Sequence, residues 1–266
     1  MVKNAARTHD APFEGTEKTV CRQESGPLPF HFYPHSPMEM FDPDIHLSQP
    51  ARTHAGGTSG PVPLPLSIAA KLHPKLLLIP RKEDCHALWD HYAMLDNIRA
   101  HSTLVADMAC AIGHQARQKG LNVSVEALLA AGMLHDLGKT YTIAHGGSHA
   151  QLGASWVMRE TRNGPIAQAV MFHVHWYWPE EWLDDERLLL TAITLYADKR
   201  VKHDAFVGLD ERFDDLLARY GVDDYVREKV AASHMQGKRV EAALSRRLGV
   251  ELHEYTADSG RLVKRT

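Results

Sequence analysis

The sequence has little cysteine, and its cysteines form no pattern. Cys21, Cys85 and Cys110 lie far apart, and no two of them are separated by two residues. This spacing excludes a CxxC metal or redox motif and does not support a disulfide framework. The N-terminus lacks the apolar segment of a signal peptide, and no apolar run approaches the roughly 20 residues of a membrane span. We therefore expect a cytoplasmic protein that contacts no membrane.

Neither sign of charge dominates the chain. It has 30 basic and 33 acidic residues, for a formal net charge of -3. This balance gives no electrostatic basis for binding a nucleic-acid polymer or an anionic membrane surface. Histidine is abundant, with 18 copies, so some histidines will lie near each other by chance. Only their placement and spacing can therefore indicate a function.

Proline is nearly absent after residue 80 and abundant before it. Residues 1–80 hold twelve of the 14 prolines, include Gly-, Ser- and Pro-rich sequence at 56–65, and show no sustained helical or strand period. Such a segment buries too little apolar surface to form a core, so it is predicted to be an extended or disordered leader. Its irregularly spaced histidines are predicted to be solvated. They are His9, His31, His35, His46 and His54.

From about residue 83 the apolar side chains take on the spacing of amphipathic helices. The first such set is Leu88, Tyr92, Leu95 and Ile98. No run of alternating β-branched residues is long enough for a central sheet. Residues 83–248 are therefore predicted to form an all-α domain, followed at 249–266 by a tail that is either a short hairpin or irregular.

Capping residues mark several of the expected helices. Ser124 is a suitable N-cap for a helix over 125–136, and Pro165 suits the first turn of a helix that ends near His173. Further helices are expected over 149–161, 186–199, 212–220 and 225–248.

The string MLHDLGK at 133–139 ends an apolar helical run with His135 and Asp136 side by side. Gly138 follows at a position where helices usually stop. A buried imidazole and a buried carboxylate are costly unless a partner satisfies them. A divalent cation is the most economical partner, so the pair predicts a metal site.

Two further candidate ligands lie near the ends of other predicted helices, His101 and Asp198. If the three helix ends meet, two imidazoles and two carboxylates surround a cation and leave positions for water. This set suits a transition metal or a hard divalent ion better than a closed structural zinc site. Each residue alone also has an ordinary alternative: a satisfied core histidine, or for Asp198 an ion pair with Lys202.

The order His101 … His135-Asp136 … Asp198 resembles the H…HD…D signature of the HD-domain phosphohydrolase superfamily. The segment LHDLGK at 134–139 is similar to that family's LHDIGK string, and YADK at 196–199 is similar to its final aspartate segment. The resemblance covers about residues 85–220. It implies an HD-domain helical bundle that binds one or two divalent ions, chosen among Mn, Fe, Zn, Mg, Co and Ni.

The segment HAQLGA, which begins at His149, resembles the HPxxGA segment of dinuclear branches of the family, with Ala150 in place of the proline. By this likeness His149 and His173 would hold a second metal, and Asp136 would bridge the two. His175 could be a further ligand or a proton donor. The alternative is that His173 and His175 are ordinary histidines at a helix end.

The GYP signature of the HD-GYP cyclic-dinucleotide phosphodiesterases is missing, and WYWP stands at 176–179 instead. Cleavage of a cyclic dinucleotide is therefore not favoured. Trp176, Trp178 and Trp182 either line the mouth of a cleft, where they could stack on a base, or pack on the helices. His145, which precedes two glycines, is expected at the surface.

Lys139 lies one helical step after the HD pair and could contact a phosphate oxygen as a point charge. Its alternative role is to sit at the negative end of a helix dipole. Lys199 and Arg200, beside Asp198, are weaker candidates for substrate contacts.

Together, the residues and the resemblance favour a metal-dependent phosphohydrolase that uses a metal-activated water. Its substrate would be a small phosphomonoester or phosphodiester, with a nucleotide as the expectation, and Asp136 and Lys139 would be its catalytic residues. Two alternatives stay open. Some HD-domain proteins are di-iron oxygenases with a similar six-ligand set, and the domain could also be a non-catalytic, nucleotide-responsive module.

Overall fold

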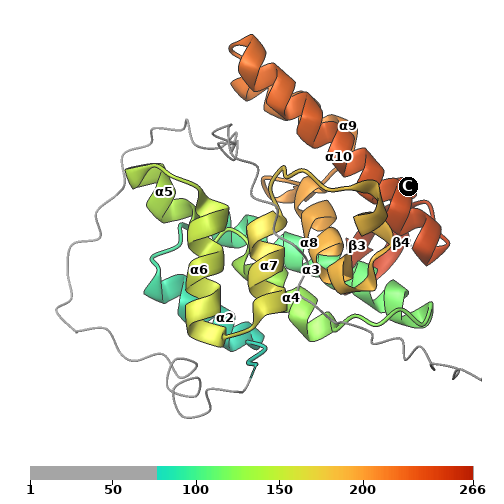
Figure 1. Cartoon of the computed structure of the whole chain (residues 1–266), viewed down its shortest axis with the longest axis horizontal. Coiled ribbons are helices and arrows are strands. Elements are labelled where there is room, and N and C mark those ends of the chain that lie inside the picture. The colour runs from blue at the N-terminus through green and yellow to red at the C-terminus, as the bar shows by residue number, and fades with distance from the viewer. Residues whose placement is uncertain (1–76, 266) are drawn as a thin grey trace, which may run out of the picture. The chain divides into compact units, whose positions relative to one another are not determined.

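The computed structural model describes residues 77–265, so the leader predicted for residues 1–80 lies, except for residues 77–80, outside the described part of the chain. The described residues confirm the all-α prediction, with two small hairpins added (Figure 1). The α-helices are α2 (Lys82–His91), α3 (Asp96–Gln118), α4 (Val125–Leu134), α5 (Lys139–His145), α6 (His149–Thr161), α7 (Gly164–Phe172), α8 (Leu189–Lys199), α9 (Leu209–Tyr220) and α10 (Asp224–Leu248). The 3-10 helices are η2 (Glu180–Asp184), η3 (Glu186–Leu188) and η4 (Leu252–Glu254). The strands are β1 (Val201–Lys202), β2 (Ala205–Phe206), β3 (Tyr255–Asp258) and β4 (Arg261–Lys264).

Side-chain caps fix where several helices begin. The Ser124 hydroxyl accepts a hydrogen bond from the Ala127 amide at the start of α4, as predicted. Asn163 caps α7 in the same way, and Pro165 lies in its first turn. These bonds satisfy amide groups that have no partner inside a helix. No helix among residues 77–265 has the length and apolar character needed to cross a bilayer.

The single helix expected through Leu88–Ile98 is wrong, because the chain turns in its middle. Helix α2 ends at His91, Ala93 has a left-handed backbone with φ of 51°, and α3 begins only at Asp96. The turn lets Met94 be buried beside α2 while Leu95 stays exposed. Tertiary packing therefore overrides the helical spacing of the apolar residues at this point.

Two apolar cores hold the described helices together. The first is built mainly from α3, α8, α9 and α10, and the second from α2, α4, α6 and α7. Helix α3 contributes to both, since it packs on α4 and on α8. Its approach to α4 is close, because a Cβ atom at Gly132 would lie 2.5 Å from the Ala106 Cα.

Helix α4 ends at Leu134, four residues before Gly138, where the sequence predicted that a helix would stop. Gly138 has a φ of -81° and is the N-cap residue of α5. A Cβ atom there would lie 2.6 Å from the His149 carbonyl oxygen and 2.8 Å from the Gly153 amide nitrogen. The glycine is needed because the turn after the HD pair packs directly against the start of α6.

The end of the chain forms a hairpin rather than an irregular tail. Strands β3 and β4 are antiparallel, and Tyr255 is paired with Lys264. Arg200, which sequence made a weak candidate for substrate contact, is fully buried and anchors this segment. Its guanidinium donates hydrogen bonds to the carbonyl oxygens of Val207, Leu252 and Tyr255. Arg200 is therefore a structural residue.

Candidate metal centre

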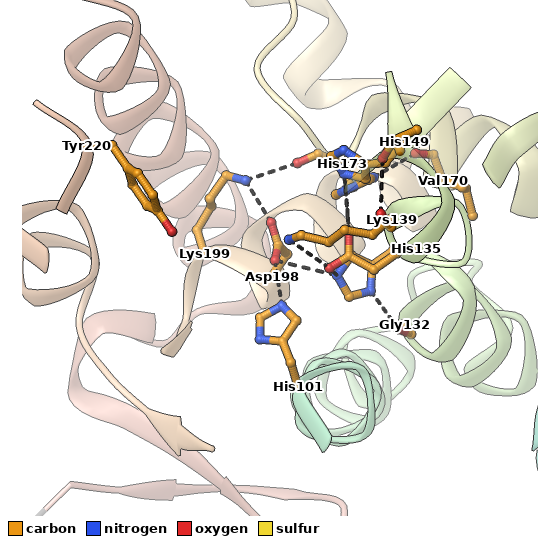
Figure 2. Close-up of polar contacts among 12 residues, drawn as sticks. His101, Gly132, His135, Lys139, His149, Val170, His173, Asp198, Lys199 and Tyr220 are labelled. Carbon is orange, nitrogen blue, oxygen red and sulfur yellow. Dashed lines mark hydrogen bonds and ion pairs between the residues drawn. The ribbon is translucent and has the colours of Figure 1, made fainter. Parts of the chain in front are cut away.

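His135 and Asp136 lie at the end of α4, where both side chains are buried. The His135 Nδ1 is 2.8 Å from the Gly132 carbonyl oxygen. Because a carbonyl oxygen can only accept, Nδ1 carries the proton in this bond and donates it. In the neutral ring the lone pair is then on Nε2, which lies 3.3 Å from Asp136 Oδ2. The same Nε2 lies 3.6 Å from Asp198 Oδ1 (Figure 2).

His101 and Asp198 complete the first cluster. His101 projects from α3 and Asp198 from the end of α8, and the His101 Nε2 is 3.0 Å from Asp198 Oδ1 (Figure 2). The helix ends predicted to meet do so, although 97 residues separate these two. Lys202, the alternative partner proposed for Asp198, instead pairs with Glu211 at 3.4 Å.

A second cluster shares Asp136. His149 is the first residue of α6 and His173 follows α7, and their Nε2 atoms are 2.9 Å apart. Asp136 Oδ1 is 3.2 Å from the Nε2 of His149 and 3.5 Å from that of His173. The His173 Nδ1 donates to the Val170 carbonyl oxygen at 2.6 Å, so its Nε2 also presents a lone pair when the ring is neutral. The two carboxylate oxygens of Asp136 therefore face different groups of histidines.

This arrangement fits a divalent cation. Several nitrogen and oxygen lone pairs face one another, and there are too few protons for each lone pair to accept a hydrogen bond. Within the described residues, the buried His135 Nε2 and Asp136 Oδ1 have no hydrogen-bond partner. One ligand atom from each of His101, His135 and Asp136 lies within 4.8 Å of the other two, and the same holds for Asp136, His149 and His173. The chemistry of this mixed nitrogen and oxygen set suits a first-row transition metal or magnesium.

The electrostatics of the cluster follow from burial and from charges in contact. Burial opposes ionisation of Asp136, but Lys139 and His135 outweigh it and hold its pKa well below the usual range. The pKa of Asp198 is likewise lowered against burial, mainly by Lys199. Burial lowers the pKa of His173 to about 4, whereas the two carboxylates overcome burial at His135 and raise its pKa to about 10. Without a metal, the cluster therefore holds its proton on His135.

Two lysines face the carboxylates. The Nζ of Lys139 is 3.2 Å from Asp136 Oδ2, and that of Lys199 is 2.7 Å from Asp198 Oδ2. Lys139 is the first residue of α5 and so lies at the positive end of its own helix. The alternative role proposed for it, at the negative end of a helix dipole, concerned the preceding helix α4, which ends at Leu134, and stays a prediction.

Two cavities open onto the metal centre, and Asp136, Lys139 and Arg212 line both. The smaller has a volume of about 510 Å³, including its open mouth, and also contacts His149, His173 and Asp198. The larger has a volume of about 1560 Å³, including its open mouth, and contacts His101. Sequence reasoning missed Arg212, because α9 carries no motif and reads as an ordinary amphipathic helix.

Of the remaining candidates, the three tryptophans and His145 line neither cavity, and His175 lines one. Trp178 is buried in the first core, and Trp176 and Trp182 pack against it, so the alternative of packing on the helices is correct. His175 lines the smaller cavity, and His145 is exposed at the end of α5, as expected.

A family model described as HD domain matches residues 98–202. The chain contains an HD domain. Every His and Asp residue of the two clusters lies within the match, whereas α9 and α10 lie outside it. HD domains belong to a superfamily of metal-dependent hydrolases, and these buried clusters are of the kind that binds divalent metal. Comparison with curated proteins finds no match, and comparison with solved structures finds none either.

Proposed function

We propose that this HD-domain protein is a phosphohydrolase that cleaves a small phosphomonoester or phosphodiester, with a nucleotide as its substrate. The observation that carries the proposal is Asp136, a buried carboxylate whose two oxygens face two separate histidine clusters beside an open cavity. A divalent cation bound there would lower the pKa of a water molecule and offset charge on the phosphoryl group.

Each protein side chain then has a defined task. His101, His135 and Asp198 would hold one cation, His149 and His173 would hold a second, and Asp136 would contact both. The carbonyl oxygens of Gly132 and Val170 hold the rings of His135 and His173 in the tautomer that presents Nε2. Such second partners fix the direction of a ligand and its basicity.

Asp136 and Lys139 would act on the reacting groups. Asp136 would orient the attacking water. Lys139 lines both cavities and lies next to Asp136, so its ammonium group would bind a phosphoryl oxygen of the substrate. An ammonium is a compact, mobile charge that suits this contact.

The larger cavity would hold the organic part of the substrate. Leu95, Ile98 and Ile143 give it apolar walls, while Asn97 and Asp204 add polar groups. A mixed wall of this kind suits a nucleoside, in which an apolar ring carries a few polar edges. We propose further that the substrate is a small molecule and that the protein acts in the cytoplasm. Neither a nucleic-acid polymer nor a membrane is proposed as a partner.

The di-iron oxygenase is the second candidate, because it would use the same six side chains. Lys139 and Lys199, both within hydrogen-bonding distance of the cluster carboxylates, favour an anionic substrate and hence the hydrolase. Protein that retains iron and changes its absorption spectrum on exposure to O2, without hydrolysing phosphate esters, would favour the oxygenase instead.

The test is the Asp136→Ala variant, assayed with Mg²⁺ or Mn²⁺ on p-nitrophenyl phosphate, bis(p-nitrophenyl) phosphate and a panel of nucleotides. We expect wild-type turnover on at least one ester and a rate in the variant equal to that of the protein-free control. Asp210→Asn is the matched control, because Asp210 is an exposed carboxylate whose partners are His234 and Lys238. Unchanged turnover in metal-loaded Asp136→Ala protein would refute the proposal.

A further inference from the structure

We propose that Arg212 of α9 binds a phosphoryl group of the substrate, so that a helix outside the matched HD region completes the binding site. This inference deepens the proposed function and rests on it. Arg212 would make the site specific for substrates that place an anionic group against its guanidinium.

The position of Arg212 is the first observation. Its side chain is only 10 % exposed, yet it lines both cavities. The two other residues common to both cavities, Asp136 and Lys139, belong to the metal centre. A group bound against Arg212 would therefore lie where the small cavity at the metal ligands meets the larger cavity.

The second observation is that the guanidinium of Arg212 is poorly satisfied inside the protein. Its ion pair with Asp215 is 3.7 Å long, and Asp215 lies closer to Arg219, at 2.6 Å. The Arg212 Nε is buried and has no hydrogen-bond partner within residues 77–265. A buried charged donor in this state is costly, because it has lost water and gained little in exchange.

The neighbouring cations have closer charged partners than Arg212 has, although the Arg219 Nε, like that of Arg212, has no hydrogen-bond partner within residues 77–265. Lys139 and Lys199 are hydrogen-bonded to the carboxylates of Asp136 and Asp198. Arg219 has Asp215 at 2.6 Å and donates to the Tyr220 hydroxyl. Arg212 is thus the guanidinium with the weakest protein partner at the cavities, and it remains available to a ligand.

The chemistry of the ligand follows from the shape of the donor. A guanidinium presents parallel N–H groups that match two oxygens of one phosphoryl group, and such paired bonds are stronger than neutral ones. Lys139, which also lines both cavities, supplies a second positive charge. The site therefore suits a phosphoryl group, which carries more charge than a single carboxylate.

The experiment measures binding of inorganic phosphate to the full chain by calorimetry, with the same Mg²⁺ concentration in cell and syringe. We compare wild type with Arg212→Gln, Arg212→Lys and Arg219→Gln. Arg219→Gln is the matched control, because it removes the same charge from the same carboxylate, Asp215. Metal content and the thermal midpoint are measured for each variant.

We expect Arg212→Gln to weaken phosphate binding by about tenfold or more, the loss of at least one charge-assisted hydrogen bond. Arg212→Lys should fall between Arg212→Gln and wild type. Arg219→Gln should change the affinity by less than about threefold, because Arg219 lines only the larger cavity and its guanidinium is already paired with Asp215. Metal content should be the same in all four proteins. If Arg212→Gln does not fold, Arg212→Lys decides the matter, since it retains the charge but loses the paired geometry.

Equal phosphate affinity in wild type and the Arg212 variants would overturn the inference, as would wild-type protein that binds no phosphate. Equal losses in Arg212→Gln and Arg219→Gln would also overturn it, because they would show a general charge effect. If phosphate binding depends on Arg212 but no ester is hydrolysed, the anion site stands and the proposed function fails. If esters are hydrolysed and phosphate binding ignores Arg212, only this inference fails.

Discussion

At His135, a proton and a metal ion compete for the same atom, Nε2. The Asp136 and Asp198 carboxylates outweigh burial and raise the pKa of His135 to about 10, so Nε2 is protonated at neutral pH without a metal. Burial lowers the pKa values of His101 and His173, so those rings are already neutral there. A metal that binds His135 must therefore displace its proton.

This competition predicts that metal affinity rises with pH. Between pH 7 and pH 9 we expect an increase of about tenfold per unit from His135 alone, with the release of roughly one proton at pH 7. The dependence should flatten as pH passes through the pKa of His135, near 10. Calorimetric titration of Zn²⁺ or Mn²⁺ in two buffers that differ in ionisation enthalpy measures the released proton. Identical apparent enthalpies in the two buffers would contradict the assignment.

Much of the metal centre could be predicted from residue identity and order. His101, His135, Asp136 and Asp198 carry a distinctive pattern, and the structure brings them together with His149 and His173. The carbonyl partners of His135 and His173 could not be predicted, because every residue has a backbone carbonyl and the sequence does not show which one a histidine will contact. Arg212 could not be predicted either, since only the packing of α9 brings this arginine to the cavities.

At the scale of elements, the turn after α4 sets the distance between the two clusters. Gly138 packs against the backbone at the start of α6, the helix that carries His149. The atoms that a Cβ would meet are backbone atoms, so they cannot move aside as a flexible side chain would. The spacing between Asp136 and His149 therefore depends on a glycine at this position.

We expect Gly138→Ala to lower the free energy of unfolding by about 1–3 kcal/mol, as overpacking does, and to weaken metal binding at the second cluster. Chemical denaturation and metal analysis measure the two effects. Gly164→Ala is the control: it lies at the start of α7 and its added Cβ meets nothing within 4 Å. That variant should be neutral or slightly more stable, because alanine restricts the unfolded chain. A Gly138→Ala protein that matches this control would show that the close approach is unimportant.

Local chemistry explains which element boundaries were predictable. Ser124 and Pro165 act on the helix that contains or follows them, so their effect is visible in a short stretch of sequence. The turn at Ala93 is different. It depends on burial of Met94 and on the Trp89 indole, which donates a hydrogen bond to the Met133 carbonyl of α4. Contacts between distant segments decided that boundary, and apolar spacing could not reveal them.

At the scale of the whole described molecule, the metal centre draws its ligands from helices of both cores. Asp198 comes from α8, which packs in the first core, whereas His149 and His173 come from α6 and the end of α7, which pack in the second. Without a cation, buried carboxylates and imidazole lone pairs from these helices face one another. A cation bound by Asp136 and these side chains would have ligands from both cores and would therefore link them.

Removal of the metal should therefore destabilise the fold and not only stop turnover. At a free metal concentration 100 times the dissociation constant, binding to the native state adds about 2.7 kcal/mol to the free energy of unfolding. Urea denaturation with EDTA, compared with added Mg²⁺ or Mn²⁺, measures this gain.

His149→Ala should retain part of the gain, because the cluster of His101, His135 and Asp198 is intact, whereas Asp136→Ala should lose most of it. His234→Ala, which alters a half-buried histidine that pairs with Asp210 and belongs to neither metal cluster, should show the full wild-type gain. Equal stability of wild type with chelator and with metal would mean that the two cores do not depend on a cation for their attachment.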